Sequence, residues 1–106
     1  MTIDEMYTLL RSVEGFAEKV VYYEWELNEA PALPFVCFFS PSDYTFAADN
    51  TAYYSRPRFN VELYTKDRDL ETEALFEEAF KTAGLYFTKE TEYLDDERCQ
   101  MTVFSL

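Results

Sequence analysis

The side chains of this chain that could take part in chemistry are nearly all carboxylates. The 106 residues include 21 Asp and Glu, two cysteines and no histidine. Without imidazole the chain lacks the commonest general base, the usual activator of a nucleophile and the commonest metal ligand. Cys37 has no CxxC partner and no histidine beside it, so we do not expect it to be a nucleophile. Cys37 and Cys99 both lie in apolar, strand-like runs and are predicted to be buried thiols rather than a disulfide.

The carboxylates gather in short clusters that need to be weighed as sites. Asp95-Asp96-Glu97 offers oxygen ligands for Ca²⁺ or Mg²⁺ but lacks the spaced D-x-D-x-D-G pattern, so a solvated hairpin turn explains it better. Glu71, Glu73 and the pair Glu77-Glu78 are interpreted as the wet face of a helix. A carboxylate pair for glycoside hydrolysis is a remote alternative, because a chain of this size rarely builds a sugar cleft. We therefore predict no catalytic, cofactor-binding or metal-binding residue, no cofactor and no enzymatic activity.

Composition and charge narrow the class of protein further. A length of 106 residues suits one domain, predicted to span residues 1–106, and 48% hydrophobic residues are too many for a disordered chain. The net charge of −12 disfavours specific binding to nucleic acid and to anionic membranes. The N-terminus carries no basic and apolar signal segment, so we expect the protein to stay in a cytoplasm unless a larger assembly carries it out. Aromatic residues make up 19% of the chain, more than a small core can enclose. This favours aromatic side chains at the surface or in an interface.

The first predicted element is an amphipathic helix. Thr2-Ile3-Asp4-Glu5 reads as a capping box, in which Thr2 and Glu5 each bond the backbone of the other. Gly15 is expected to stop the helix. Its apolar stripe recurs at three- and four-residue steps: Ile3, Met6, Tyr7, Leu10 and Val13.

Three strands are predicted next. Residues 20–25 are β-branched and aromatic, and residues 35–39 form a short apolar strand expected to be central and covered on both faces. Residues 40–51 are predicted to be a long polar loop. Residues 58–66 alternate strictly and indicate a half-buried strand, which residues 53–55 could extend backwards past a proline.

A second helix and two closing strands complete the pattern. Asp67-Arg68-Asp69 opens a helix over residues 70–83 that Gly84 closes. Its predicted apolar stripe is Leu70, Ala74, Phe76, Ala79, Phe80 and Ala83. Strands over residues 85–93 and 98–104 follow, joined by the turn at residues 94–97.

These elements predict an α+β fold in the order α-β-β-β-α-β-β. We expect a mostly antiparallel sheet of four to five strands with two helices packed on one face. The predicted buried residues are Ile3, Met6, Leu10, Val21, Val36, Cys37, Phe59, Val61, Leu63, Phe76, Phe80, Phe87, Met101 and Val103.

Three segments, taken in order, carry a resemblance to a known family. They are residues 32–39 (ALPFVCFF) with the loop through Asp49-Asn50, residues 58–69 (RFNVELYTKDRD), and residues 84–93 (GLYFTKETEY) before the closing strand. Together they resemble the tail terminator proteins, also called tail completion or head–tail joining proteins, of Firmicutes siphophages and prophages. The resemblance covers nearly the whole chain, and the segment Asn60-Val61-Glu62-Leu63-Tyr64 is its best marker. The family has no short functional motif, so no site residue is carried over.

The resemblance implies a structural virion protein. Such a protein forms a ring, commonly a hexamer, that caps the tail tube, stops its polymerisation and presents a face to the head connector. Its implied partners are further copies of itself, the tail tube protein and the head connector protein. Its implied location is the host bacterial cytoplasm during assembly and then the head-proximal end of the tail, and an acidic lumen would let DNA slide past.

Other functions stay open at this point. The chain could be a different head–tail connector, an adaptor or a minor capsid component. It could also be an acidic regulatory protein that mimics DNA, because dense surface carboxylates are what such a mimic requires. An enzyme is the most distant alternative.

Overall fold

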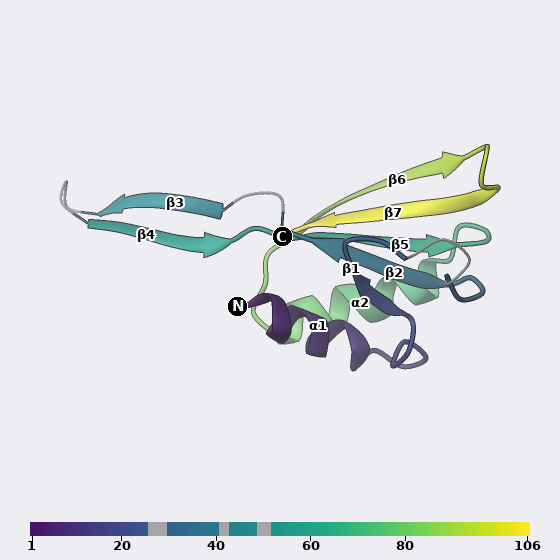
Figure 1. Ribbon diagram of the computed structural model, residues 1–106, viewed down its shortest axis with the longest axis horizontal. Helices are drawn as coiled ribbons and strands as arrows, with labels where there is room; N and C mark the ends of the chain where they lie inside the picture. The colour runs from purple at the N-terminus through teal and green to yellow at the C-terminus, as the bar shows by residue number, and fades with distance from the viewer. Residues whose placement is uncertain (26–29, 41–42, 49–51) are drawn as a thin grey trace.

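The computed structural model describes residues 1–25, 30–40, 43–48 and 52–106. Five strands form one sheet in the order β1-β2-β5-β7-β6, and β3 pairs with β4 in a separate hairpin (Figure 1). Every neighbouring pair in the large sheet is antiparallel except β1 with β2. The elements are α1 (Ile3–Arg11), β1 (Val20–Tyr22), β2 (Phe35–Phe39), β3 (Asp43–Ala48), β4 (Ala52–Pro57), β5 (Asn60–Thr65), α2 (Leu70–Thr82), β6 (Thr88–Leu94) and β7 (Cys99–Ser105).

The predicted fold class is confirmed. Both helices lie on the same face of a mostly antiparallel five-stranded sheet (Figure 1). The elements of this body follow the predicted order α-β-β-β-α-β-β, and the β3–β4 hairpin is inserted between its second and third strands. Within the described residues no helix is long and apolar enough to cross a bilayer.

The capping box at the start of α1 is confirmed. The Thr2 Oγ1 atom accepts a hydrogen bond from the Glu5 backbone N–H at 3.1 Å, and the Thr2 N–H donates to Glu5 Oε1 at 2.9 Å. Met6 and Leu10 are buried as predicted, but Ile3 is 40% exposed. Ile3 lies in the first turn beside β1, which is the edge strand of the sheet in the described part of the chain.

The orientation of α2 differs from the prediction. Phe76 and Phe80 are buried, but Leu70 is 63% exposed and Ala74 is exposed too. The third buried residue of this helix is Glu73. Glu73, Phe76 and Phe80 are spaced by three and four residues, so they share the face that contacts the sheet.

The hydrophobic core fills the layer between the helices and the sheet. Phe76, Phe80 and Phe104 contact one another with ring centroids 5.3–6.5 Å apart, in tilted and edge-to-face arrangements. Phe16 packs edge-on against Phe76 at 4.8 Å. The buried core residues are Met6, Leu10, Val13, Phe16, Val20, Val36, Phe38, Phe59, Val61, Leu63, Phe76, Phe80, Phe104 and Leu106.

Four residues predicted to be in this core are only half-buried. Phe87 packs at its margin. Val21, Met101 and Val103 lie on the side of the sheet away from the helices. Paired residues on neighbouring strands point to the same side, and the partners of these three are Cys37, Tyr64 and Glu62, none of which is in the core cluster. The β7 strand is apolar on both sides, so its composition alone does not say which side meets the helices.

The predicted loop at residues 40–51 is wrong. Asp43–Ala48 is strand β3, and residues 41–42 and 49–51 lie outside the described residues. Residues 53–55 do not extend β5; they belong to β4, which pairs with β3 from Asp43↔Pro57 to Ala48↔Ala52. Two short strands this close in sequence can pair locally, and their mixed composition conceals the alternation expected of a half-buried strand.

Candidate interaction surface

Within the described residues, one face of the large sheet carries no helix, and Figure 1 shows α1 and α2 together on the opposite face. We call the helix-free side the uncovered face. Trp25 and Leu33 of the connection between β1 and β2 line one end of it. Alternate side chains of a strand point to opposite sides of a sheet, so the register of the strands shows which residues face this side. They are Val21 from β1, Phe35, Cys37 and Phe39 from β2, Asn60, Glu62 and Tyr64 from β5, Thr88, Glu90, Glu92 and Leu94 from β6, and Cys99, Met101, Val103 and Ser105 from β7.

The uncovered face is apolar and hollowed at the end where β2 and β7 begin. A pocket of about 390 Å³ there is bordered by Trp25, Phe35, Cys37, Tyr64 and Cys99. The Trp25 ring packs edge-on against Phe35 at 6.2 Å, and Phe35 lies 5.1 Å from the Tyr64 ring. An antiparallel sheet face that meets only water normally carries polar residues. This face therefore has the composition of a surface that another protein covers.

Two buried polar atoms on or beside this face lack a hydrogen-bond partner within the described part of the chain. They are the Trp25 Nε1 donor and the Asn60 Oδ1 acceptor. A buried polar atom without a partner costs about 1–3 kcal/mol.

Two ionisable groups on this face, the Tyr64 hydroxyl and the Cys37 thiol, have raised pKa values. The Tyr64 hydroxyl donates to Glu62 Oε1 at 3.0 Å. Burial, followed by the negative charge of Glu62, raises the pKa of Tyr64 above its ordinary value. The same two causes raise the pKa of the Cys37 thiol to about 11. Cys37 is therefore a protonated thiol at neutral pH, which agrees with its predicted role as a small hydrophobe. Cys37 and Cys99 are both buried and free, as predicted.

The β3–β4 hairpin projects beyond the end of this sheet (Figure 1). We call β3 and β4 together the arm. Its two strands pack chiefly against each other. The molecule measures 49 × 28 × 24 Å with a radius of gyration of 14.9 Å, whereas a compact chain of this length has a radius of about 13 Å. A two-stranded hairpin without further packing is marginally stable in water, so the arm needs a surface to lie against.

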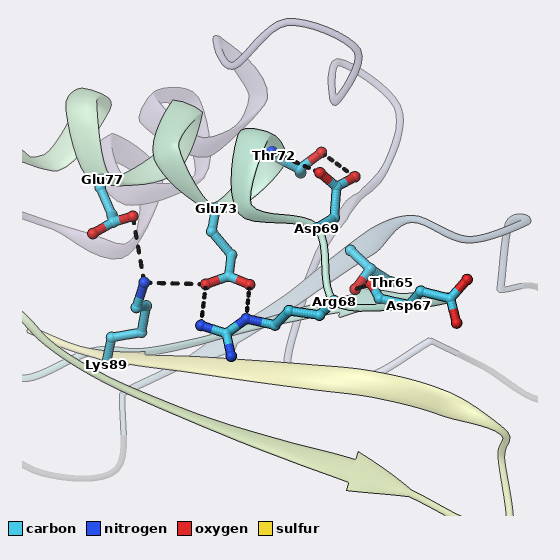
Figure 2. A network of polar contacts seen from close by, with 8 residues as sticks. All are labelled: Thr65, Asp67, Arg68, Asp69, Thr72, Glu73, Glu77 and Lys89. Carbon is cyan, nitrogen blue, oxygen red and sulfur yellow. Dashed lines mark hydrogen bonds and ion pairs between the residues drawn. The ribbon is translucent and has the colours of Figure 1, made fainter.

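Glu73 is the one buried charged side chain among the residues whose burial is described. Figure 2 shows its carboxylate between Arg68 and Lys89. Arg68 Nε donates to Oε2 at 2.7 Å, and Lys89 Nζ lies 3.1 Å from Oε1 and 3.5 Å from Glu77 Oε2. The Glu73 side chain is 1% exposed, while those of Arg68 and Lys89 are 47% and 26% exposed. The prediction that Glu73 lies on the wet face of the helix is therefore wrong. Its carboxylate can be buried because Arg68 and Lys89, two cations from outside the helix, neutralise its charge.

The Glu73 cluster has a structural role. Lys89 belongs to β6 and Arg68 to the connection between β5 and α2, so the carboxylate joins the helix to one strand of the sheet and to the segment that precedes the helix. At the start of the same helix, Asp69 accepts hydrogen bonds from the Thr72 backbone N–H and hydroxyl, and these bonds lower the pKa of Asp69 (Figure 2). Both features orient α2 on the sheet.

The other carboxylate clusters are dispersed. Asp95-Asp96-Glu97 lies exposed in the turn between β6 and β7, as the solvated-turn interpretation predicts. Glu71 and Glu78 are exposed on α2, and Glu77 is half-buried. No group of three or more His, Cys, Asp or Glu residues in the described ranges is arranged to hold a metal ion.

Sequence reasoning missed both Glu73 and the uncovered face, although each left a signal. Glu73 stands three and seven residues before Phe76 and Phe80, which are the core positions of α2. In β7, Met101 and Val103 place apolar side chains on the uncovered face, and Phe104 places one on the face that meets the helices. A strand that is apolar on both sides indicates that both sides are covered.

No protein-family model matches this chain, and no curated protein is significantly similar to it.

Proposed function

We propose that this protein is a structural component of a bacteriophage tail, of the tail-terminator type. It assembles as a ring at the head-proximal end of the tail tube, ends tube polymerisation and helps to join the tail to the head. Its partners are further copies of itself, the tail tube protein and the head connector protein.

The uncovered face is the observation that carries this proposal. A small domain that leaves an apolar, aromatic sheet face and a projecting arm is suited to build an assembly with other proteins. The resemblance of residues 32–39, 58–69 and 84–93 to tail terminators suggests which assembly this is.

The chemistry of the described side chains supports a non-enzymatic role. The buried thiol of Cys37 is held in its unreactive form by its raised pKa. The buried carboxylate of Glu73 is engaged by Arg68 and Lys89. Each of these two buried groups is thus held in packing or in an ion pair.

Deleting the gene from the phage or prophage that encodes it tests the proposal. Electron microscopy of the resulting lysate should show tails of irregular, extended length and heads without tails. Tails of normal length that fail to attach would assign the chain to a connector or adaptor instead. Tails of normal length joined to heads would overturn both roles. Complementation with the unmutated gene is the control.

A further inference from the structure

We propose that the arm of one copy docks on the uncovered face of a second copy, so that copies associate head to tail. This inference rests on the self-association in the proposed function and specifies the two surfaces that meet. It does not depend on the identity of the tail or of the head.

The arm cannot reach the uncovered face of its own chain in the arrangement seen. It continues away from the end of the sheet, whereas the face lies along the strands themselves (Figure 1). The arm lies between β2 and β5 in the chain. An arm that occupies this face therefore comes from a second molecule.

The dimensions of the two surfaces agree. Each arm strand has six residues and spans about 20 Å. The strands β6 and β7 have seven residues each and span about 23 Å. An arm laid across this face can therefore follow most of its length.

Charge favours the arm as the part of a second copy that approaches. Residues 43–57 contain two acids, Asp43 and Asp49, and one base, Arg56, so they contribute only −1 to the net charge of −12. The uncovered face is rimmed by Glu90 and Glu92, and body-to-body contact would bring dense carboxylates together. A nearly neutral segment meets the least repulsion there.

The composition and the backbone of the arm also favour it as the segment that docks. Residues 43–57 include four aromatic residues, Tyr44, Phe46, Tyr53 and Tyr54, which is the composition that protein interfaces favour. A hairpin also presents outward-facing backbone N–H and C=O groups along its edges.

An arm and a face that differ form a heterologous contact, which leaves one free arm and one free face at the ends of every open chain of copies. Such a contact closes into a ring where the rotation permits. A heterologous contact also means that a copy without its arm can still bind, through its intact face, the intact arm of a copy whose face is altered.

Sedimentation velocity of the purified protein over a concentration series tests this. One variant replaces residues 43–57 by a short Gly-Ser linker, which the pairing of Asp43 with Pro57 makes possible. The other is Met101→Lys, a half-buried residue of the uncovered face. Leu75→Lys, on the exposed side of α2, is the matched control. Each of the first two should weaken self-association about tenfold or more, and the control should not.

Mixing the two defective variants gives the sharpest result. The intact arm of the Met101→Lys copy should bind the intact face of the armless copy, giving a 1:1 pair that grows no further. Raising the salt concentration should strengthen association of the unmodified protein, because both copies are acidic. Absence of the mixed pair, or unchanged association of either variant, would overturn the inference, with circular dichroism showing that both variants are folded.

An unmodified protein that stays monomeric up to its solubility limit would also overturn docking as a contact that the chain makes by itself. The proposed function would survive that result, because tail length in the deletion phage tests it separately.

Discussion

The two faces of the large sheet differ in how completely their side chains are covered. The face beneath α1 and α2 holds Val61, Leu63 and Phe104, all without measurable exposure. The opposite face holds Tyr64, Met101 and Val103, which are half-buried although no helix lies over them. The first face stabilises the fold of one molecule, and the second retains apolar surface for contact with another. Substitutions on neighbouring positions should separate these two roles.

The largest expected effect is on the covered face. Leu63→Asp places an unpaired carboxylate at a fully buried position and should prevent folding, because burying an unpaired charge costs more than a small domain's total stability. Val103→Asp, one strand away on the uncovered face, should leave a cooperative thermal transition. Circular dichroism melts of both variants test the comparison, and a normal melt for Leu63→Asp would show that the assigned strand register is wrong.

The next largest effect concerns Glu73. Replacing both Arg68 and Lys89 by Met leaves its carboxylate buried without a cation and should lower the free energy of unfolding by about 3–5 kcal/mol. Glu73→Leu should be close to neutral, because Arg68 and Lys89 are partly exposed and water can solvate them. Urea denaturation measures both variants and the unmodified protein. A Glu73→Leu variant as unstable as the double variant would contradict this account.

A smaller effect is expected at alkaline pH, from the uncovered face. The unfolded thiol of Cys37 ionises near pH 9 but the folded one only near pH 11, so the unfolded state loses its proton first. The stability contribution of the buried thiol is therefore complete below about pH 9 and is lost as the pH rises toward 11. Urea midpoints at pH 8 and pH 10.5 should differ less in Cys37→Ala than in the unmodified protein. Equal shifts in the two proteins would exclude Cys37 as a source.

The smallest effect belongs to the cap of α1. Thr2→Ala removes the hydrogen bond to the Glu5 backbone and should lower the stability by about 1 kcal/mol. The Thr2 backbone N–H, which the variant keeps, and the Thr2 side chain, which it loses, both lower the pKa of Glu5. The side-chain share of this stabilisation should be present above the ordinary Glu range and be lost as the pH falls through the lowered value. Thermal melts at neutral and strongly acidic pH should show a gap between the two proteins that narrows in acid. A gap that widens in acid would contradict this sign.

The elements that the sequence predicts well are those with local signals. The capping box of Thr2 and Glu5, the alternation of Phe59, Val61 and Leu63, and the burial of both cysteines depend on residues close together in the chain. The helix α2 was placed correctly, but its orientation was not. Its rotation depends on Lys89, a residue from a distant strand, and on Arg68 before the helix.

The arm and the uncovered face also depend on pairing between strands, which the sequence does not predict. The segment 40–51 carries Pro41, Asp49 and Asn50, which favour a loop, and the strand at residues 43–48 is seen only in its pairing with β4. For β7, the register with β5 decided that Phe104 faces the helices while Met101 and Val103 face away.

The sequence by itself determined the class of fold, the order of the body's elements and the absence of histidine chemistry, because composition and local periodicity specify these directly. The tertiary structure alone decided which side of each strand is covered and which carboxylate is buried. Both depend on contacts between residues far apart in the chain, and a one-residue shift of register would move every side chain of a strand to the other face.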